Sequence, residues 1–167
     1  MGRNPTVVKT GETKQHTLAS EVAFEGVSLH KGLRSNILIR PAAPHHGIVF
    51  ERTDIKTQNR IIPAKWDNVS DTTLSTTVAN HRGVSVSTIE HLMAAFAGCG
   101  VDNALVEIDC PEVPIMDGSS RPFVDFFEKV GLSHQDACRK VIKILEPIEV
   151  TEKDARIKLL PADNFSI

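Results

Sequence analysis

Apolar and polar residues alternate along the first part of the chain with the period of two that is typical of β-strands. The strand-like segments are residues 16–24, 33–40, 48–52, 72–79 and 84–86. Turns rich in glycine, proline and asparagine separate them, and residues 54–60 form a polar loop. The pattern predicts that this part of the chain folds as a sheet.

Residues 87–97 follow a helical period instead. Ser87 and Glu90 match the S-x-x-E capping box that begins many helices, and Gly98 and Gly100 supply its end. Apolar residues at helical spacing predict the face that packs on the sheet: Ile89, Leu92, Met93 and Phe96.

A further strand and a second helix follow. Residues 103–110 alternate, and residues 111–116 continue extended to a turn that Asp117 organises. We expect Ser119 or Ser120 to cap the second helix, Gly131 to end it, and its apolar face to comprise Phe123, Phe126, Phe127 and Val130. Together the elements predict an α+β fold, a two-layer sandwich with helices on one face of a mainly antiparallel sheet.

The expected domain organisation has three parts. Residues 1–14 form a polar N-terminal tail, residues 15–132 form the first sandwich domain, and residues 133–167 are a linker with the first strands of an incomplete second domain. The strand-like segments in this last part are residues 140–145, 148–150 and 155–160. Because so few strands cannot bury a core of their own, the sequence is expected to be interrupted at Ile167.

Composition narrows the class of protein. A chain of 167 residues with 41% hydrophobic and 24% charged residues is typical of a globular protein. The net charge of −2 lacks the basic excess that binding to nucleic acid requires. No transmembrane segment or signal-like apolar stretch is found, so we expect a cytoplasmic protein. The three widely spaced cysteines indicate neither a disulfide framework nor a cysteine zinc site.

Glu90 and His91 are the residues best suited to chemistry. Helical geometry directs both away from the apolar stripe of their helix. An imidazole near a helix N-terminus favours the neutral form that binds metal, and an adjacent carboxylate can act on water, which suits a hydrolytic zinc site. Alternatively, Glu90 only caps the helix and His91 is a solvated side chain. One histidine is also fewer than the three protein ligands of a catalytic zinc.

The remaining polar candidates are weaker. The histidines in turns or the linker are expected to be surface residues, and those beside strands to be structural: His45, His46, His81 and His134 in the first group, His16 and His30 in the second. Asp109 and Glu112 flank Pro111 at a strand end, where carboxylates are usually solvated. No Gly-rich phosphate loop and no serine or cysteine nucleophile motif occurs.

Several long motifs resemble one enzyme family, in order and spacing. They are the runs at residues 15–18, 26–32, 52–54, 86–98, 100–104 and 112–119, the fourth of which reads VSTIEHLMAAFAG. From about Lys14 to Ile167 the chain resembles the UDP-3-O-acyl-N-acetylglucosamine deacetylases, zinc-dependent enzymes of lipid A synthesis.

The resemblance implies paired α/β domains with the active site between them. His91 would be a zinc ligand, and Glu90 the general base acting on water that the zinc activates to hydrolyse the N-acetyl group. Thr73, Leu74 and Ser75 match a strand segment that borders the substrate site. The substrate would be a small molecule, an acylated UDP-sugar.

The chain departs from the family in one large respect. The family takes two further zinc ligands from a His-x-x-x-Asp helix in the second domain, and neither that helix nor a further histidine that assists the leaving amine is present. We therefore expect a fragment or truncation that alone binds zinc weakly and turns over little. The alternatives are a catalytically silent binding module or a purely structural module.

Overall fold

The computed structural model describes residues 13–163 and 166, and the chain divides into two compact units. Residues 14–137 form one unit, and the described parts of residues 1–13 and 138–167 belong to the other.

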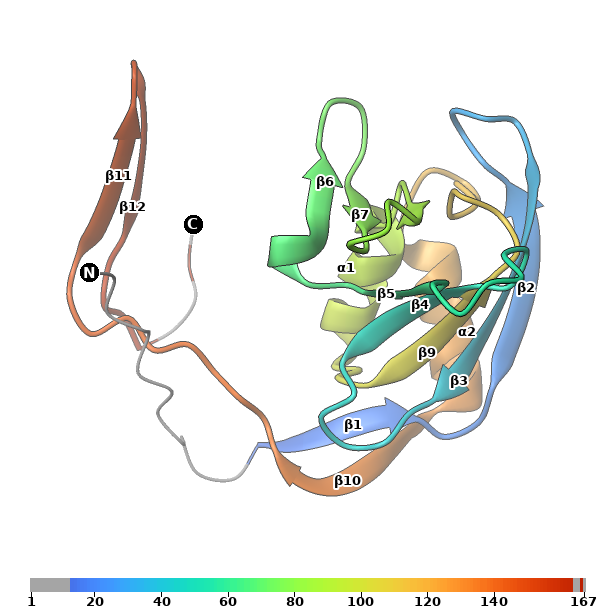
Figure 1. The fold of residues 1–167 in the computed structure, drawn as a ribbon. Coiled ribbons are helices and arrows are strands. Elements are labelled where there is room, and N and C mark those ends of the chain that lie inside the picture. Colours follow the sequence, from blue (N-terminus) through green and yellow to red (C-terminus); the bar gives the residue numbers. More distant parts are fainter. Residues whose placement is uncertain (1–12, 164–165, 167) are drawn as a thin grey trace. The chain divides into compact units, whose positions relative to one another are not determined.

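A five-stranded sheet forms the centre of the larger unit (Figure 1). Its strands, in spatial order, are β2 (Val22–Val27), β3 (Arg34–Pro41), β9 (Ala104–Ile108), β4 (Ile48–Arg52) and β5 (Ile61–Pro63). Neighbouring strands are antiparallel except β4 and β9, which run parallel.

Two helices, α1 (Glu90–Cys99) and α2 (Arg121–Val130), lie on the same side of this sheet (Figure 1). Alternate β9 residues, Ala104, Val106 and Ile108, are fully buried in the core that the helices share with the sheet. The Phe96 and Phe127 rings stack between the helices at a centroid distance of 4.8 Å. The predicted two-layer α+β sandwich with a mainly antiparallel sheet is confirmed.

Two smaller sheets accompany the central one. Strand β1 (Lys14–Leu18) pairs with β10 (Leu132–Cys138). Strands β6 (Val69–Asp71), β7 (Thr77–Ala79) and β8 (Ser85–Val86) form an antiparallel sheet, preceded by a short 3-10 helix at Trp66–Asn68. In the smaller unit, β11 (Ile148–Glu152) and β12 (Ala155–Leu159) form an antiparallel hairpin whose residues are all exposed.

Three strand predictions were wrong in detail. Residues 16–24 form two strands, because the chain bends after β1, where the Ala19 N–H donates to the Gly131 carbonyl. Residues 72–76, expected within one strand, form the loop between β6 and β7. Residues 140–145 contain no strand.

Residues 133–136, expected to be a linker, lie within β10. Their polar character predicted a linker. A strand with no fully buried residue can also consist of polar residues, and β10 is such a strand. The Gln135 side chain instead joins a network in the larger unit by donating from Nε2 to the Ala42 carbonyl at 2.7 Å.

The predicted capping box at the start of α1 does not form, whereas the prediction that Ser119 or Ser120 occupies the N-cap position of α2 is confirmed. Ile89 occupies the N-cap position of α1, and no side chain caps this helix. The Ser87 hydroxyl donates to the Pro111 carbonyl instead. Ser120 holds the N-cap position of α2 without a side-chain cap, whereas the Ser119 hydroxyl accepts from the Arg121 N–H. Both helices end as predicted, α1 at Gly100 in the left-handed conformation and α2 at Gly131.

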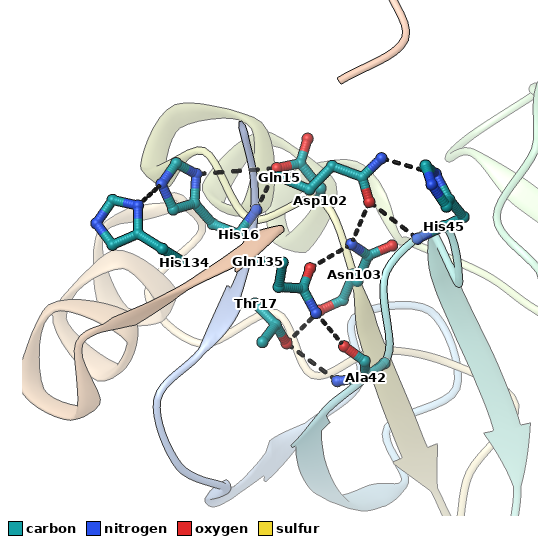
Figure 2. A network of polar contacts seen from close by, with 9 residues as sticks. All are labelled: Gln15, His16, Thr17, Ala42, His45, Asp102, Asn103, His134 and Gln135. Atoms are coloured by element: carbon teal, nitrogen blue, oxygen red, sulfur yellow. Dashed lines mark hydrogen bonds and ion pairs between the residues drawn. The ribbon is translucent and has the colours of Figure 1, made fainter. Parts of the chain in front are cut away.

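A polar network around Asn103 joins β1, β9, β10 and the loop after β3 (Figure 2). Asn103 is 1% exposed, and its amide nitrogen donates to Gln15 Oε1 at 2.9 Å and to Gln135 Oε1 at 2.7 Å. Its amide oxygen accepts from the Gly47 N–H at 2.8 Å, and its carbonyl accepts from the Thr17 hydroxyl at 2.7 Å. All its polar atoms are thereby satisfied, as a buried amide requires.

Replacing Asn103 with alanine should destabilise the protein by about 1–3 kcal/mol, because it leaves buried donors and acceptors of its neighbours unpaired. Urea unfolding followed by circular dichroism measures the loss. His46→Ala is the control, since that side chain is exposed and, among the described residues, hydrogen-bonds only to the adjacent Gly47 carbonyl. Equal stability of the two variants would contradict the structural role of Asn103.

Candidate active site

Ser87, which leads into α1, pairs with the segment at residues 111–113. The Ser87 N–H donates to the Pro111 carbonyl at 3.0 Å, and the Val113 N–H donates to the Ser87 carbonyl at 3.1 Å. Thr88 then adopts a left-handed conformation with φ of 56°, and the helix begins two residues later. The predicted pair Glu90 and His91 therefore lies in the first turn of α1, and both residues are partly buried.

The Glu90 carboxylate is oriented by the chain outside its own helix. Its Oε2 accepts a hydrogen bond of 3.0 Å from the Thr76 N–H, in the loop between β6 and β7. Among the described residues no hydrogen bond reaches Oε1. Because no side chain caps α1 and Glu90 bonds to Thr76, the interpretation of Glu90 as a capping residue is contradicted. Its Oε1 is the oxygen available to accept a proton.

His91 follows Glu90 and lies near the turn before α2. There the Asp117 carboxylate accepts from both the hydroxyl and the N–H of Ser119, as expected for a residue that organises this turn. These hydrogen bonds lower the pKa of Asp117, and the charge of His91 adds a smaller lowering. An acidic group thus accompanies the His91 imidazole.

The described residues do not form a complete metal site. Within residues 13–163 and 166, no group of three or more His, Cys, Asp or Glu side chains could hold a metal ion. A catalytic zinc takes three protein ligands, so His91 fits as one of them and the others would have to come from elsewhere.

Thr73, Leu74 and Ser75 lie in the loop between β6 and β7, and not on a strand as the resemblance implied. They line an open hollow of about 420 Å³ together with His30, Lys31 and Ser87. Leu74 is 79% exposed, which leaves an apolar group at a largely polar site. The next residue, Thr76, bonds to Glu90, so this loop connects the hollow to the start of α1.

Glu112 differs from what its position at a strand end predicted. It was expected to be solvated, but it is 0% exposed. Its Oε1 accepts from the His30 N–H, the His30 ring Nδ1 and the Thr88 hydroxyl, at 3.0, 2.9 and 2.9 Å, and its Oε2 accepts from the Lys31 N–H at 3.1 Å. Burial raises the pKa of this carboxyl, but the hydrogen bonds lower it by more than burial raises it. The pKa therefore lies below the ordinary value.

The sequence carried one signal for this burial. Glu112 is the only charged residue in the otherwise apolar run from Cys110 to Met116. A single charged residue in an apolar run either interrupts the buried segment or is itself buried and paired.

The histidines other than His30 and His91 lie away from Glu90 and His91. They belong to the network around Asn103 or lie on the surface. His16 Nε2 and His134 Nδ1 are 2.9 Å apart, and His45 Nδ1 lies 2.8 Å from Gln15 Nε2 (Figure 2). His134 is on β10 and not in a linker, and His46 and His81 are exposed. No helix in the described part of the chain is long and apolar enough to cross a membrane.

Comparison with known proteins is consistent with these motifs. A family model described as UDP-3-O-acyl N-acetylglycosamine deacetylase matches residues 15–167. A relative from Idiomarina loihiensis is 46% identical over 154 residues, which are 92% of this chain and 50% of that protein. One from Phenylobacterium zucineum is 48% identical over 153 residues, 92% of this chain and 52% of that protein.

Both relatives carry the name UDP-3-O-acyl-N-acetylglucosamine deacetylase, as does one from Methylococcus capsulatus that is 45% identical over 154 residues, 92% of this chain and 50% of that protein. The chain spans about half the length of the curated relatives that it matches.

The buried Glu112 should contribute stability that depends on pH. Because its folded pKa is below the ordinary value, the contribution is present above the unfolded pKa of about 4.3 and is lost as the pH falls through the folded pKa. The difference in unfolding free energy between the parent protein and Glu112→Gln should therefore shrink between pH 7 and pH 3. Glu128→Gln, at an exposed position, should show no such trend. A difference that stays constant with pH would contradict the assignment.

Proposed function

Because this chain belongs to the UDP-3-O-acyl N-acetylglycosamine deacetylase family, we propose that the protein carrying it hydrolyses the N-acetyl group of UDP-3-O-acyl-N-acetylglucosamine. The products would be UDP-3-O-acyl-glucosamine and acetate, and the reaction an early committed step of lipid A biosynthesis. The observation that carries the proposal is the position of Glu90 and His91 in the first turn of α1, with the Glu90 carboxylate oriented by the Thr76 N–H.

His91 would hold a zinc ion with ligands from outside the described residues. Zinc, when bound, supplies a Lewis acid that favours hydrolysis of an amide. Glu90 then acts as general base, with Oε1 accepting the proton of the attacking water while Oε2 stays bonded to Thr76. The proton transfer needs this fixed orientation, because a general base must lie within hydrogen-bond reach of the proton that it takes.

The hollow beside the loop of Thr73, Leu74 and Ser75 is the proposed substrate-binding surface. Its polar lining, which includes His30 and Lys31, suits the sugar nucleotide, and the exposed Leu74 suits the acyl group. Its connection to Glu90 through Thr76 supports a role next to the reacting amide.

We also propose that residues 138–167 begin a second, similar domain that supplies the missing ligands. The division of the chain at residue 138 and the exposed hairpin β11–β12 support this. A UDP-sugar substrate is a nucleotide-activated metabolite, which supports a cytoplasmic location.

In the full-length protein, Glu90→Gln should lower kcat by about 10²–10⁴-fold, the usual contribution of a general base. Bound zinc should stay near that of the parent protein, because Glu90 is not a ligand in this mechanism. Metal content by mass spectrometry and release of acetate are the two measurements. Full turnover by Glu90→Gln would refute the assignment of the base.

The chain of 167 residues, tested alone, should bind zinc much more weakly than the full-length protein and show no turnover. One imidazole is too few for a catalytic zinc. Competition with a chelator measures the affinity. Tight binding of the acylated UDP-sugar without zinc or turnover would favour the alternative of a binding module instead.

A further inference from the structure

Glu112 joins three segments that are far apart in the sequence. Its own segment, residues 111–116, bridges to Ser28 through Pro114 on one side and to Ser87 on the other. The carboxylate then adds side-chain bonds in both directions, to the loop at His30 and Lys31 and to Thr88. A fully buried carboxylate is costly unless it is this well paired, so its position is tightly specified.

Thr88 has a backbone conformation that needs such support. A β-branched residue with φ of 56° is a steric outlier, and strain of this kind persists only where the surroundings determine the conformation. Thr88 is 3% exposed, and its hydroxyl donates to Glu112 Oε1. The hydrogen bond that Thr88 donates to Glu112 therefore holds a strained residue in place.

The direction of α1 depends on that residue. The left-handed Thr88 turns the chain from β8 into the helix, so its conformation sets where the first turn begins and where Glu90 and His91 lie. The backbone on either side is tied, at Ser87 to Pro111 and at Ile89 to Thr76. A change of conformation at Thr88 would consequently shift both Glu90 and His91.

We propose that Glu112 is a positioning residue, which acts through the Thr88 hydroxyl to fix Glu90 and His91 in the geometry for hydrolysis. This inference rests on the proposed function, because the proposed function assigns Glu90 and His91 their roles. It explains why a carboxylate is buried beside the helix start without pointing at the reacting groups.

Thr88→Val in the full-length protein is the first test, with Thr17→Val as the matched control. Both threonines are buried, at 3% and 6% exposure, and each hydroxyl donates one hydrogen bond, of 2.9 and 2.7 Å. Loss of either bond should lower the thermal midpoint, but only Thr88 lies before the active-site pair.

Thr88→Val should lower kcat by about 10- to 100-fold with little change in KM, the scale of a small misplacement of reacting groups. It should also weaken zinc binding by about 10-fold, since His91 is displaced. Thr17→Val should leave both quantities near those of the parent protein. Thr88→Ser, which keeps the hydroxyl, should restore them.

A double-mutant cycle tests whether Glu112 acts through Thr88. If it does, Glu112→Gln combined with Thr88→Val should reduce kcat no more than the more severe single variant. Effects that multiply, unchanged kcat and zinc affinity in Thr88→Val, or an equal loss in Thr17→Val would each overturn the proposal. If Thr88→Val does not fold, Thr88→Ala and Thr17→Ala replace the pair.

The proposed function can fail separately. A full-length parent protein that binds zinc but releases no acetate would refute the deacetylase reaction. The zinc affinities of the Thr88 and Thr17 variants would still decide whether Glu112 and Thr88 position His91.

Discussion

The buried carboxylate of Glu112 is the constraint on which the candidate site depends. A charge without exposure to water is tolerated only where hydrogen bonds replace its hydration, and four donors from two other segments do so here. These donors can meet it only if the loop after β2, the segment after β9 and the entry to α1 converge. One ionised group therefore determines the arrangement of the chain around Glu90 and His91.

At the other end of β9, the neutral side-chain amide of Asn103 also joins several segments of the larger unit. Asn103 brings β1, β10 and the loop after β3 together through bonds to Gln15, Gln135 and Gly47 (Figure 2). Between the two polar junctions, the core is apolar and is formed by alternate strand residues and the facing sides of the helices. Hydrophobic burial stabilises the packing of the helices on the sheet. The two polar junctions at Glu112 and Asn103 determine how the loops and the strands β1 and β10 attach to these layers.

Periodicity was enough to predict the layers. The alternation in β3 and β9 and the helical spacing of Leu92 and Phe96 report burial directly, because each apolar side chain needs only a face to pack against. Resemblance of whole motifs then selected Glu90 and His91. The pattern failed where a polar residue has a partner far away in the sequence. Glu112 was expected to be solvated and Gln135 to lie in a linker. The apparent capping box of Ser87 and Glu90 does not form, because both side chains bond to other segments.

We propose that the first turn of α1 carries a metal-dependent hydrolytic pair. A crystal structure of the full-length protein grown with zinc, with the metal located by anomalous scattering, tests it most directly. We expect zinc at about 2.0–2.1 Å from a ring nitrogen of His91, with Glu90 nearby but not coordinating it and still bonded to Thr76. Zinc bound elsewhere, or coordinated by Glu90 in place of His91, would refute the proposed roles of both residues.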